Sequence, residues 1–312
     1  MTTRTSALET KTKRDTGIHL GTAPLHLKRI LFATDFSSSA SAAFRAAARL
    51  SQHFGSTLYM THVISPMLYA AGGGVVAPAL QEVEIRRAQE KLAHYFAQLP
   101  EFASIKHEEI VTCGQIKELI RDIAEEKRID LVVMGSHGRG GIGKLALGSV
   151  AESALRLLRC PALICGPECT RNYHPFKSIL LATGLSVGSL RSAQYASTLA
   201  EQFHAHLTIV HVVPPDTAKD ESTHKGQRQQ QVAAIGELIP SSRELRKHTR
   251  YSIQSGDPVP KLLRIAKLAN ANLIVMGARE GGPMADHAPW ATVSRVIHEA
   301  RCPVLAIQPH FG

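Results

Sequence analysis

The strongest constraint on this chain is that it repeats itself. Residues 28–66 (KRILFATDFSSSASAAFRAAARLSQHFGSTLYMTHVISP) are echoed by residues 177–215 (KSILLATGLSVGSLRSAQYASTLAEQFHAHLTIVHVVPP) at an offset of 149. Farther along, residues 114–136 correspond to residues 256–278 at an offset of 142. One structural unit is therefore used twice, and the first copy carries seven extra residues in its middle.

The repeat divides the chain into domains. Its 312 residues suit two domains of about 150 residues each. The polar stretch 1–25 has no counterpart in the second copy and is interpreted as a flexible tail. The first domain is predicted over 26–168 and the second over 176–310, with 169–175 as the linker.

Composition narrows the class of protein. A content of 44% hydrophobic and 20% charged residues is enough for a buried core. The chain has no run of about 18 apolar residues and begins without the apolar core of a secretion signal, so we expect a cytoplasmic protein with no membrane contact. Five cysteines with irregular spacing favour free thiols in a reducing compartment. A net charge of +10 favours anionic partners.

Short apolar runs alternate with longer helical patterns. In the first copy, strands are predicted over residues 30–34, 58–63, 106–112, 131–134 and 162–165. Helices are predicted over residues 38–54, 80–99, 115–126 and 149–158. This alternation predicts an α/β fold with a doubly wound parallel sheet, because right-handed crossovers lay helices on both faces.

Two loops at predicted strand ends have unusual composition. Ligands of open α/β sheets bind beyond the carboxyl ends of the strands. The first strand is followed there by the run Thr34–Ser37, which contains Asp35. The fourth is followed by residues 135–149, GSHGRGGIGKLALGS, with six glycines, two cations and Ser149, which we expect to cap the next helix. Such a loop favours an anion, because glycine lets backbone amides approach a phosphate.

Two familiar phosphate motifs overlap in this loop and neither fits. Gly138, Gly140 and Gly143 match the dinucleotide pattern GxGxxG, but they follow the fourth strand and not the first. Gly143 and Lys144 nearly complete a Walker A loop, yet the following Leu145 has no hydroxyl to hold magnesium. A P-loop NTPase is therefore disfavoured.

A third pattern is more demanding. Gly135, two residues, Gly138, nine residues, Gly148 and Ser149 follow an apolar strand and accompany Asp35 after the first strand. Here the chain resembles the universal stress protein family, in its ATP-binding type, over about residues 26–310. The resemblance implies two tandem five-stranded sheets of order 3-2-1-4-5, of the adenine-nucleotide α-hydrolase-like class, with a nucleotide at the strand ends.

The resemblance also implies a set of contacts. The implied site consists of Asp35, Val63, Met134, Gly135, Gly138, Arg139, Gly148 and Ser149. Asp35 and Gly135 would hold the ribose, and the backbone of Val63 would meet the adenine. Gly138, Gly148 and Ser149 would hold the phosphates, with charge added by Arg139 and Lys144. The expected cofactor is ATP, with or without Mg²⁺.

The second copy departs from this pattern. Gly184 stands where the first copy has Asp35, Glu280 replaces the glycine at 138, and Trp290 with Ala291 replaces the Gly-Ser pair. We therefore expect one nucleotide site per chain and a degenerate second domain. The family usually dimerises, and here the two domains are expected to pair through the last strands, 162–165 and 304–307, with further homo-oligomerisation left open.

Several histidines and Asp35 have plainer interpretations. Asp35 could be the helix N-cap as well as a ribose ligand. His62 and His211 recur at the same strand end in both copies, which favours packing or hydrogen bonding over catalysis. His204 and His206 lie near His211, but their spacing matches no standard metal site.

The cysteines are also interpreted as structural. Cys160 and Cys302 each precede a proline at equivalent positions. Cys165 and Cys169 are four residues apart, which is not the CxxC spacing of a redox pair. The glycine run 72–74 is either a lid near the adenine or a loose loop.

The leading hypothesis is an ATP-binding, nucleotide-responsive stress or signalling factor. No general base, magnesium-binding acid pair or arginine finger accompanies the loop in the sequence, so any hydrolysis should be slow. Two alternatives remain open: a nucleotide hydrolase or adenylyl-transferring enzyme of the same wider group, and an interaction scaffold without ligand. Nucleic acid is disfavoured as a partner, because the basic tail lacks interleaved aromatics.

Overall fold

The computed structural model describes most of both repeats. The described residues are 25–65, 78–97, 102–136, 147–169, 176–185, 189–213, 221–238, 242–278 and 291–308. The first repeat contains β1 (Arg29–Ala33), α1 (Ser38–Phe54), β2 (Thr57–Ile64), α3 (Pro78–Ala97), β3 (His107–Cys113), α4 (Ile116–Glu126), β4 (Leu131–Gly135), α5 (Ser149–Leu157) and β5 (Ala162–Cys165). The second contains β6 (Ser178–Thr183), α6 (Ser189–Gln202), β7 (His206–Val213), α7 (Glu221–Leu238), α8 (Arg243–Lys247), β8 (Thr249–Ser255), α9 (Pro258–Leu268), β9 (Leu273–Gly277), α10 (Ala291–Glu299) and β10 (Val304–Ile307).

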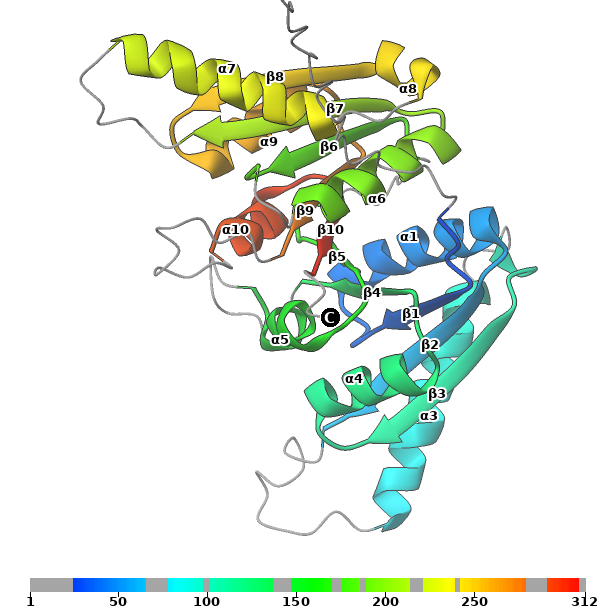
Figure 1. Ribbon diagram of the computed structural model, residues 1–312. Helices are drawn as coiled ribbons and strands as arrows, with labels where there is room; N and C mark the ends of the chain where they lie inside the picture. Colours follow the sequence, from blue (N-terminus) through cyan, green and yellow to red (C-terminus); the bar gives the residue numbers. More distant parts are fainter. Residues whose placement is uncertain are drawn as a thin grey trace, which may run out of the picture.

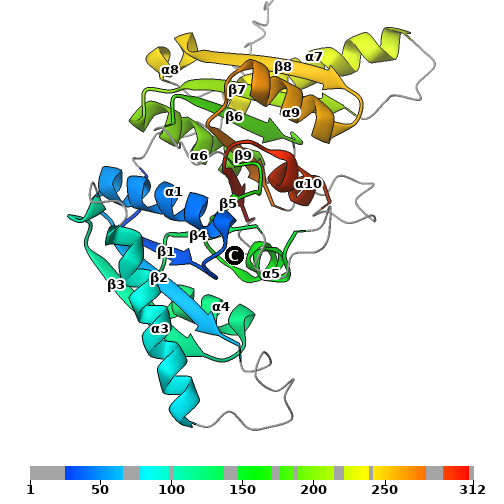
Figure 2. The ribbon, with the colours of Figure 1, turned by 180° about the vertical axis from the view of Figure 1, so that it is seen from behind.

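The strands form one continuous ten-stranded sheet, in the order β3-β2-β1-β4-β5-β10-β9-β6-β7-β8 (Figure 1; Figure 2). Within each half the order is 3-2-1-4-5, and all neighbours there are parallel. The halves meet at an antiparallel pair, β5 with β10, in which Leu163 faces Leu305. This pair, called the seam below, leaves neither strand as an open edge.

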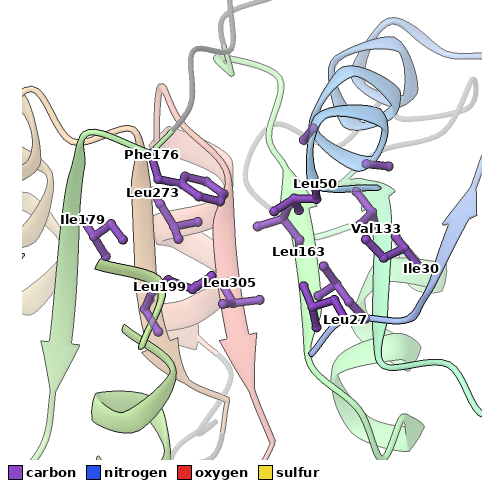
Figure 3. Close-up of a cluster of buried hydrophobic side chains, with 14 of the residues drawn as sticks. Leu27, Ile30, Leu50, Val133, Leu163, Phe176, Ile179, Leu199, Leu273 and Leu305 are labelled. Carbon is purple, nitrogen blue, oxygen red and sulfur yellow. The ribbon is translucent and has the colours of Figure 1, made fainter. Parts of the chain in front are cut away.

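Buried side chains form two layers, one on each face of the sheet. On one face, the cluster combines residues of α1 and α6 with Phe176, Leu163 and Leu305. Figure 3 shows this cluster running across the seam, from Ile30 and Leu50 to Ile179 and Leu199. The cluster on the other face combines α4 and α5 with α9 and α10. Both halves of the chain therefore share both layers of the core.

Local sequence explains where the first helix begins and ends. The hydroxyl of Ser37 accepts a hydrogen bond from the backbone N–H of Ala40 and caps the start of α1. Gly55 ends the helix in the left-handed region, at φ +64°. The predicted bounds of this helix and of the strand at 162–165 match the structure, whereas β3 begins at His107, one residue later than predicted.

None of the helices in the described part of the chain is both long and apolar enough to span a membrane.

Candidate functional site

A cleft of about 400 Å³ opens at the carboxyl ends of the first-half strands. It lies at the point where the strand order reverses: β1 has β2 as its neighbour on one side and β4 on the other. The lining residues come from the ends of β1, β2 and β4 and from the first turns of α4 and α5: Ala33, Thr34, Asp35, Thr61, His62, Val63, Ile116, Ile120, Met134, Gly135, Ser136, Gly148, Ser149, Val150 and Ala151. Six of the eight predicted site residues are therefore together around one cleft.

The turn after β1 presents Asp35 to this cleft. The hydroxyl of Thr34 accepts a hydrogen bond from the N–H of Phe36 at 3.0 Å, and Oδ1 of Asp35 accepts one from the N–H of Ser37 at 3.1 Å. Phe36 has φ +63°, and its counterpart Leu185 has φ +57°. A positive φ is unfavourable for a non-glycine residue. Because it occurs at both positions, the two repeats form the same turn, which in the first repeat contains Asp35.

Asp35 is not the N-cap of the following helix. The cap is Ser37, whose hydroxyl accepts from Ala40 N at 3.2 Å. The carboxylate instead closes the turn that leads into the helix, two residues earlier in the chain. The capping interpretation of Asp35 is therefore wrong, and the physical reason is that the extended residue that precedes a helix, here Ser37, holds the cap position.

His62 supports the turn from the neighbouring strand. Its Nδ1 donates a hydrogen bond to the carbonyl oxygen of Thr34 at 2.8 Å. In the second repeat, Nδ1 of His211 donates to the carbonyl of Thr183 at 2.8 Å. The same bond joins the first and second strands of both repeats, which agrees with the structural interpretation of the two histidines.

Much of the lining of the cleft is apolar. It includes the buried side chains of Val63 and Met134 and, from α4, Ile116 and Ile120. These two isoleucines were not among the residues predicted from the sequence. Their spacing of four residues, which puts both on one face of a helix directly after the third strand, is a signal that could have found them.

Gly135 lies where β4 ends against the start of α1. A Cβ atom on Gly135 would lie 2.5 Å from Oγ of Ser39 and 2.9 Å from the backbone nitrogen of Ala40. A side chain therefore cannot be accommodated unless α1 moves. Because Gly135 has no side chain, the turn with Asp35 and the end of β4 can lie close together.

The start of α5 closes the polar side of the cleft. The N-cap position is occupied by Gly148, with φ −59° and ψ 144°, and Ser149 is the first helical residue. The expectation that Ser149 caps the helix is therefore wrong, because the chain already turns at the glycine. Ser149 is exposed and lines the cleft. The first-turn N–H groups of an α-helix have no acceptor within the helix, so this end of α5 favours an anion.

Some predicted residues lie outside the described part of the chain. These are Gly138, Arg139 and Lys144 of the glycine-rich loop, the glycines at 72–74, and Glu280 and Trp290 of the second repeat. Their contribution to a site stays a prediction from the sequence.

The equivalent cleft of the second repeat is smaller, at about 180 Å³. Gly184 lies at the position of Asp35, and Gly277 at that of Gly135. Among the described residues that line it, there is no carboxylate. The described lining of the second cleft therefore has no counterpart of the Asp35 carboxylate.

The thiols and histidines elsewhere do not form a described metal centre. Among the placed residues, no group of three or more His, Cys, Asp or Glu side chains could hold a metal ion. All five cysteines are free. Burial raises the pKa of Cys160 and of Cys302 to about 12, so both carry protons at neutral pH.

Comparison with known proteins gives a consistent result. The model of the universal stress protein family matches residues 26–166 and again 175–308. A universal stress protein of Mycolicibacterium smegmatis is 24% identical over 291 residues, which cover 90% of this chain and 97% of that protein. Universal stress protein A homolog 1 of Coxiella burnetii is 32% identical over 145 residues, 45% of this chain and 96% of its own length.

A solved structure shares the arrangement of both repeats. The crystal structure of a universal stress protein from Archaeoglobus fulgidus superposes with a TM-score of 0.66 at 21% identity, over 91% of this chain and 99% of that one. The likeness in fold thus extends over both halves of the chain. With the family model matched twice, this chain belongs to the universal stress protein family and carries two of its domains in tandem.

Proposed function

We propose that the first domain binds ATP in the cleft at the ends of β1, β2 and β4, and that the second domain binds none. In this proposal the protein is a cytoplasmic, nucleotide-responsive stress factor with at most slow hydrolysis. The observation that carries it is one cleft whose lining combines apolar side chains with a carboxylate, a serine and a helix N-terminus.

Each part of ATP matches one part of that cleft. The adenine ring needs an apolar slot, which Ile116, Ile120 and Met134 provide. The ribose hydroxyls are donors, for which the Asp35 carboxylate is the acceptor. The phosphates need N–H groups and a hydroxyl, which the segment from Ser149 to Ala151 offers at the start of α5.

The size of the two clefts supports one site per chain. Pockets for small molecules usually measure about 300 to 1,000 Å³. The first cleft, at about 400 Å³, falls within that range, and the second, at about 180 Å³, falls below it. The missing carboxylate at Gly184 removes the ribose acceptor as well.

The test is to copy the second repeat into the first. Gly148→Trp puts an indole at the mouth of the cleft, where the second repeat has Trp290. The backbone at Gly148 has φ −59°, which tryptophan adopts without strain, so we expect the fold to persist. We expect ATP at millimolar concentration to raise the melting temperature of the wild type by several degrees and to leave that of Gly148→Trp unchanged.

The matched control is Gly236→Trp, because a Cβ atom on Gly236 of α7 meets nothing within 4 Å. This variant should keep the response to ATP. Asp35→Ala is a second site variant, expected to weaken ATP binding about 10- to 100-fold through the loss of hydrogen bonds to a charged acceptor. Unchanged affinity for ATP in Gly148→Trp would contradict the proposal.

A further inference from the structure

A second-domain side chain contacts the residue that precedes the polar side of the first-domain cleft. The backbone N–H of Leu147 donates a hydrogen bond to Oγ of Ser294, in the middle of α10, at 3.2 Å. Leu147 immediately precedes Gly148, the N-cap of α5. In both ribbon views α10 lies beside α5 where the two halves meet (Figure 1; Figure 2).

The segment from Leu147 to Ser149 is therefore held from two sides. The N–H of Gly148 donates to the carbonyl of Ser136, at the end of β4, at 2.9 Å. That bond belongs to the first domain, and the bond to Ser294 belongs to the second. Leu147 is also buried, 7% exposed, in the core layer that contains Val293, Val296 and Ile297 of α10.

Helix α10 also packs closely against the first domain at a second point. A Cβ atom on Gly166, directly after β5, would lie 1.9 Å from the carbonyl oxygen of Ile297. The backbone of the first domain thus approaches α10 as closely as a glycine permits. Contacts at Gly166 and Leu147, together with the seam, fix the place of the Ser294 hydroxyl.

The first repeat cannot give the second repeat an equivalent hydrogen bond. By the offset of 142 residues, Leu147 corresponds to Pro289, and Ser294 corresponds to Glu152. Proline has no backbone N–H to donate. Glu152 instead accepts a hydrogen bond from Arg156 within α5, at 2.8 Å. The support therefore runs in one direction, from the degenerate repeat to the repeat that keeps the cleft.

We propose that Ser294 is a positioning residue for ATP: it holds the segment at the start of α5 in place from the second domain, so that the first domain binds the phosphates with help from its degenerate partner. This inference rests on the proposed function of the first cleft. The inference gives the second domain a role in ATP binding, although the described lining of its own cleft contains no carboxylate.

The test compares ATP with adenosine, which lacks phosphates, by titration calorimetry on the full chain. We expect Ser294→Ala to weaken ATP binding about five- to tenfold, the cost of one hydrogen bond, and to change adenosine binding less than twofold. Ser294→Thr keeps the hydroxyl and should bind ATP as the wild type does. Ser255→Ala, an exposed serine at the end of β8, is the matched control.

The outcomes separate the two proposals. If the wild type binds ATP and Ser294→Ala binds it equally well, the inference is overturned and the proposed function stands. If Ser294→Ala weakens ATP and adenosine to the same degree, the serine has only a general structural role and the inference is again overturned. If the wild type binds no ATP, the proposed function fails and the inference fails with it.

Discussion

At the scale of single residues, burial decides the chemistry of the thiols near the seam. Cys165 is fully buried at the end of β5, and its hydrogen bond with Cys169 together with desolvation raises its pKa well above the usual value. Cys302, 8% exposed just before β10, has its pKa raised to about 12 by burial. A thiol reacts as the thiolate, so these side chains behave at neutral pH as small apolar groups.

These thiols predict a loss of stability in alkaline solution. Below about pH 9 the Cys302 thiol is protonated in both states; above it the unfolded chain loses the proton while the folded chain keeps it up to about pH 12. The free energy of unfolding should therefore fall as pH rises from 9 to 12. Between pH 8 and pH 10, Cys302→Ala should lose about 1 kcal/mol less than the wild type.

The measurement is urea unfolding of both proteins at several pH values, with the free energy of unfolding compared as a slope against pH. The slope is the informative quantity, because removing the side chain lowers stability at every pH. Parallel curves for Cys302→Ala and the wild type would show that the buried thiol does not contribute.

At the scale of elements, the geometry of the site depends on how closely α1 approaches β4. The buried face of α1 consists largely of alanines, such as Ala43 and Ala47, which are fully buried. Small side chains allow a helix to lie near a sheet, and Gly135 extends this to the end of β4. Because the turn with Asp35 leads directly into α1, the position of the helix sets the position of the carboxylate.

Gly135→Ala should therefore impair both stability and binding. The added methyl group would lie 2.5 Å from Oγ of Ser39, so α1 must shift. We expect the free energy of unfolding to fall by about 1 to 3 kcal/mol, as for other overpacked sites, and ATP affinity to fall with it. Urea unfolding and calorimetry measure the two effects.

A glycine on an open surface gives the control with the opposite sign. Gly236→Ala, within α7, meets nothing within 4 Å and should raise stability by up to about 1 kcal/mol, because alanine favours the helix more than glycine does. A Gly135→Ala protein as stable as the wild type would show that α1 is not closely packed at this point.

At the scale of the whole molecule, the two domains share their core. Both hydrophobic layers cross the seam, and Figure 3 shows Leu163 and Leu305 in the layer that joins the halves. Separating the halves would expose these side chains and the edges of β5 and β10. We infer that the two domains unfold as one cooperative unit, although the sequence divides them clearly.

Leu305→Ala tests this cooperativity. Leu305 is 4% exposed in β10, and its truncation should lower the free energy of unfolding of the whole chain by about 2 to 4 kcal/mol. Circular dichroism in urea should show a single transition, displaced as a whole to lower denaturant concentration. Two separated transitions, with only one of them displaced, would contradict the shared core.

Much of the fold and part of the site could be predicted because the relevant signals are local. Apolar runs of strand length and helical spacings predicted the elements of the first repeat, and the repeat carried them to the second. The meeting of Asp35 with the end of β4 at Gly135 was predictable because parallel strands end at one edge of the sheet, whereas Val63 and Gly148 were expected from the family resemblance. The N-cap at Gly148 was not, since a serine beside a glycine offers two starting points and sequence patterns place boundaries only to within a few residues.

The sequence by itself determined the duplicated α/β unit, the places of its strands and helices, and the loss of the acid and the glycine-serine pair in the second copy, because each is written in neighbouring residues. Only the tertiary structure decided that the carbonyl oxygen of Ile297 lies against Gly166 and that Ser294 accepts a hydrogen bond from Leu147. Both contacts join residues more than 100 positions apart. Such contacts depend on how the helices on both faces pack against the shared sheet, and local sequence patterns do not encode that packing.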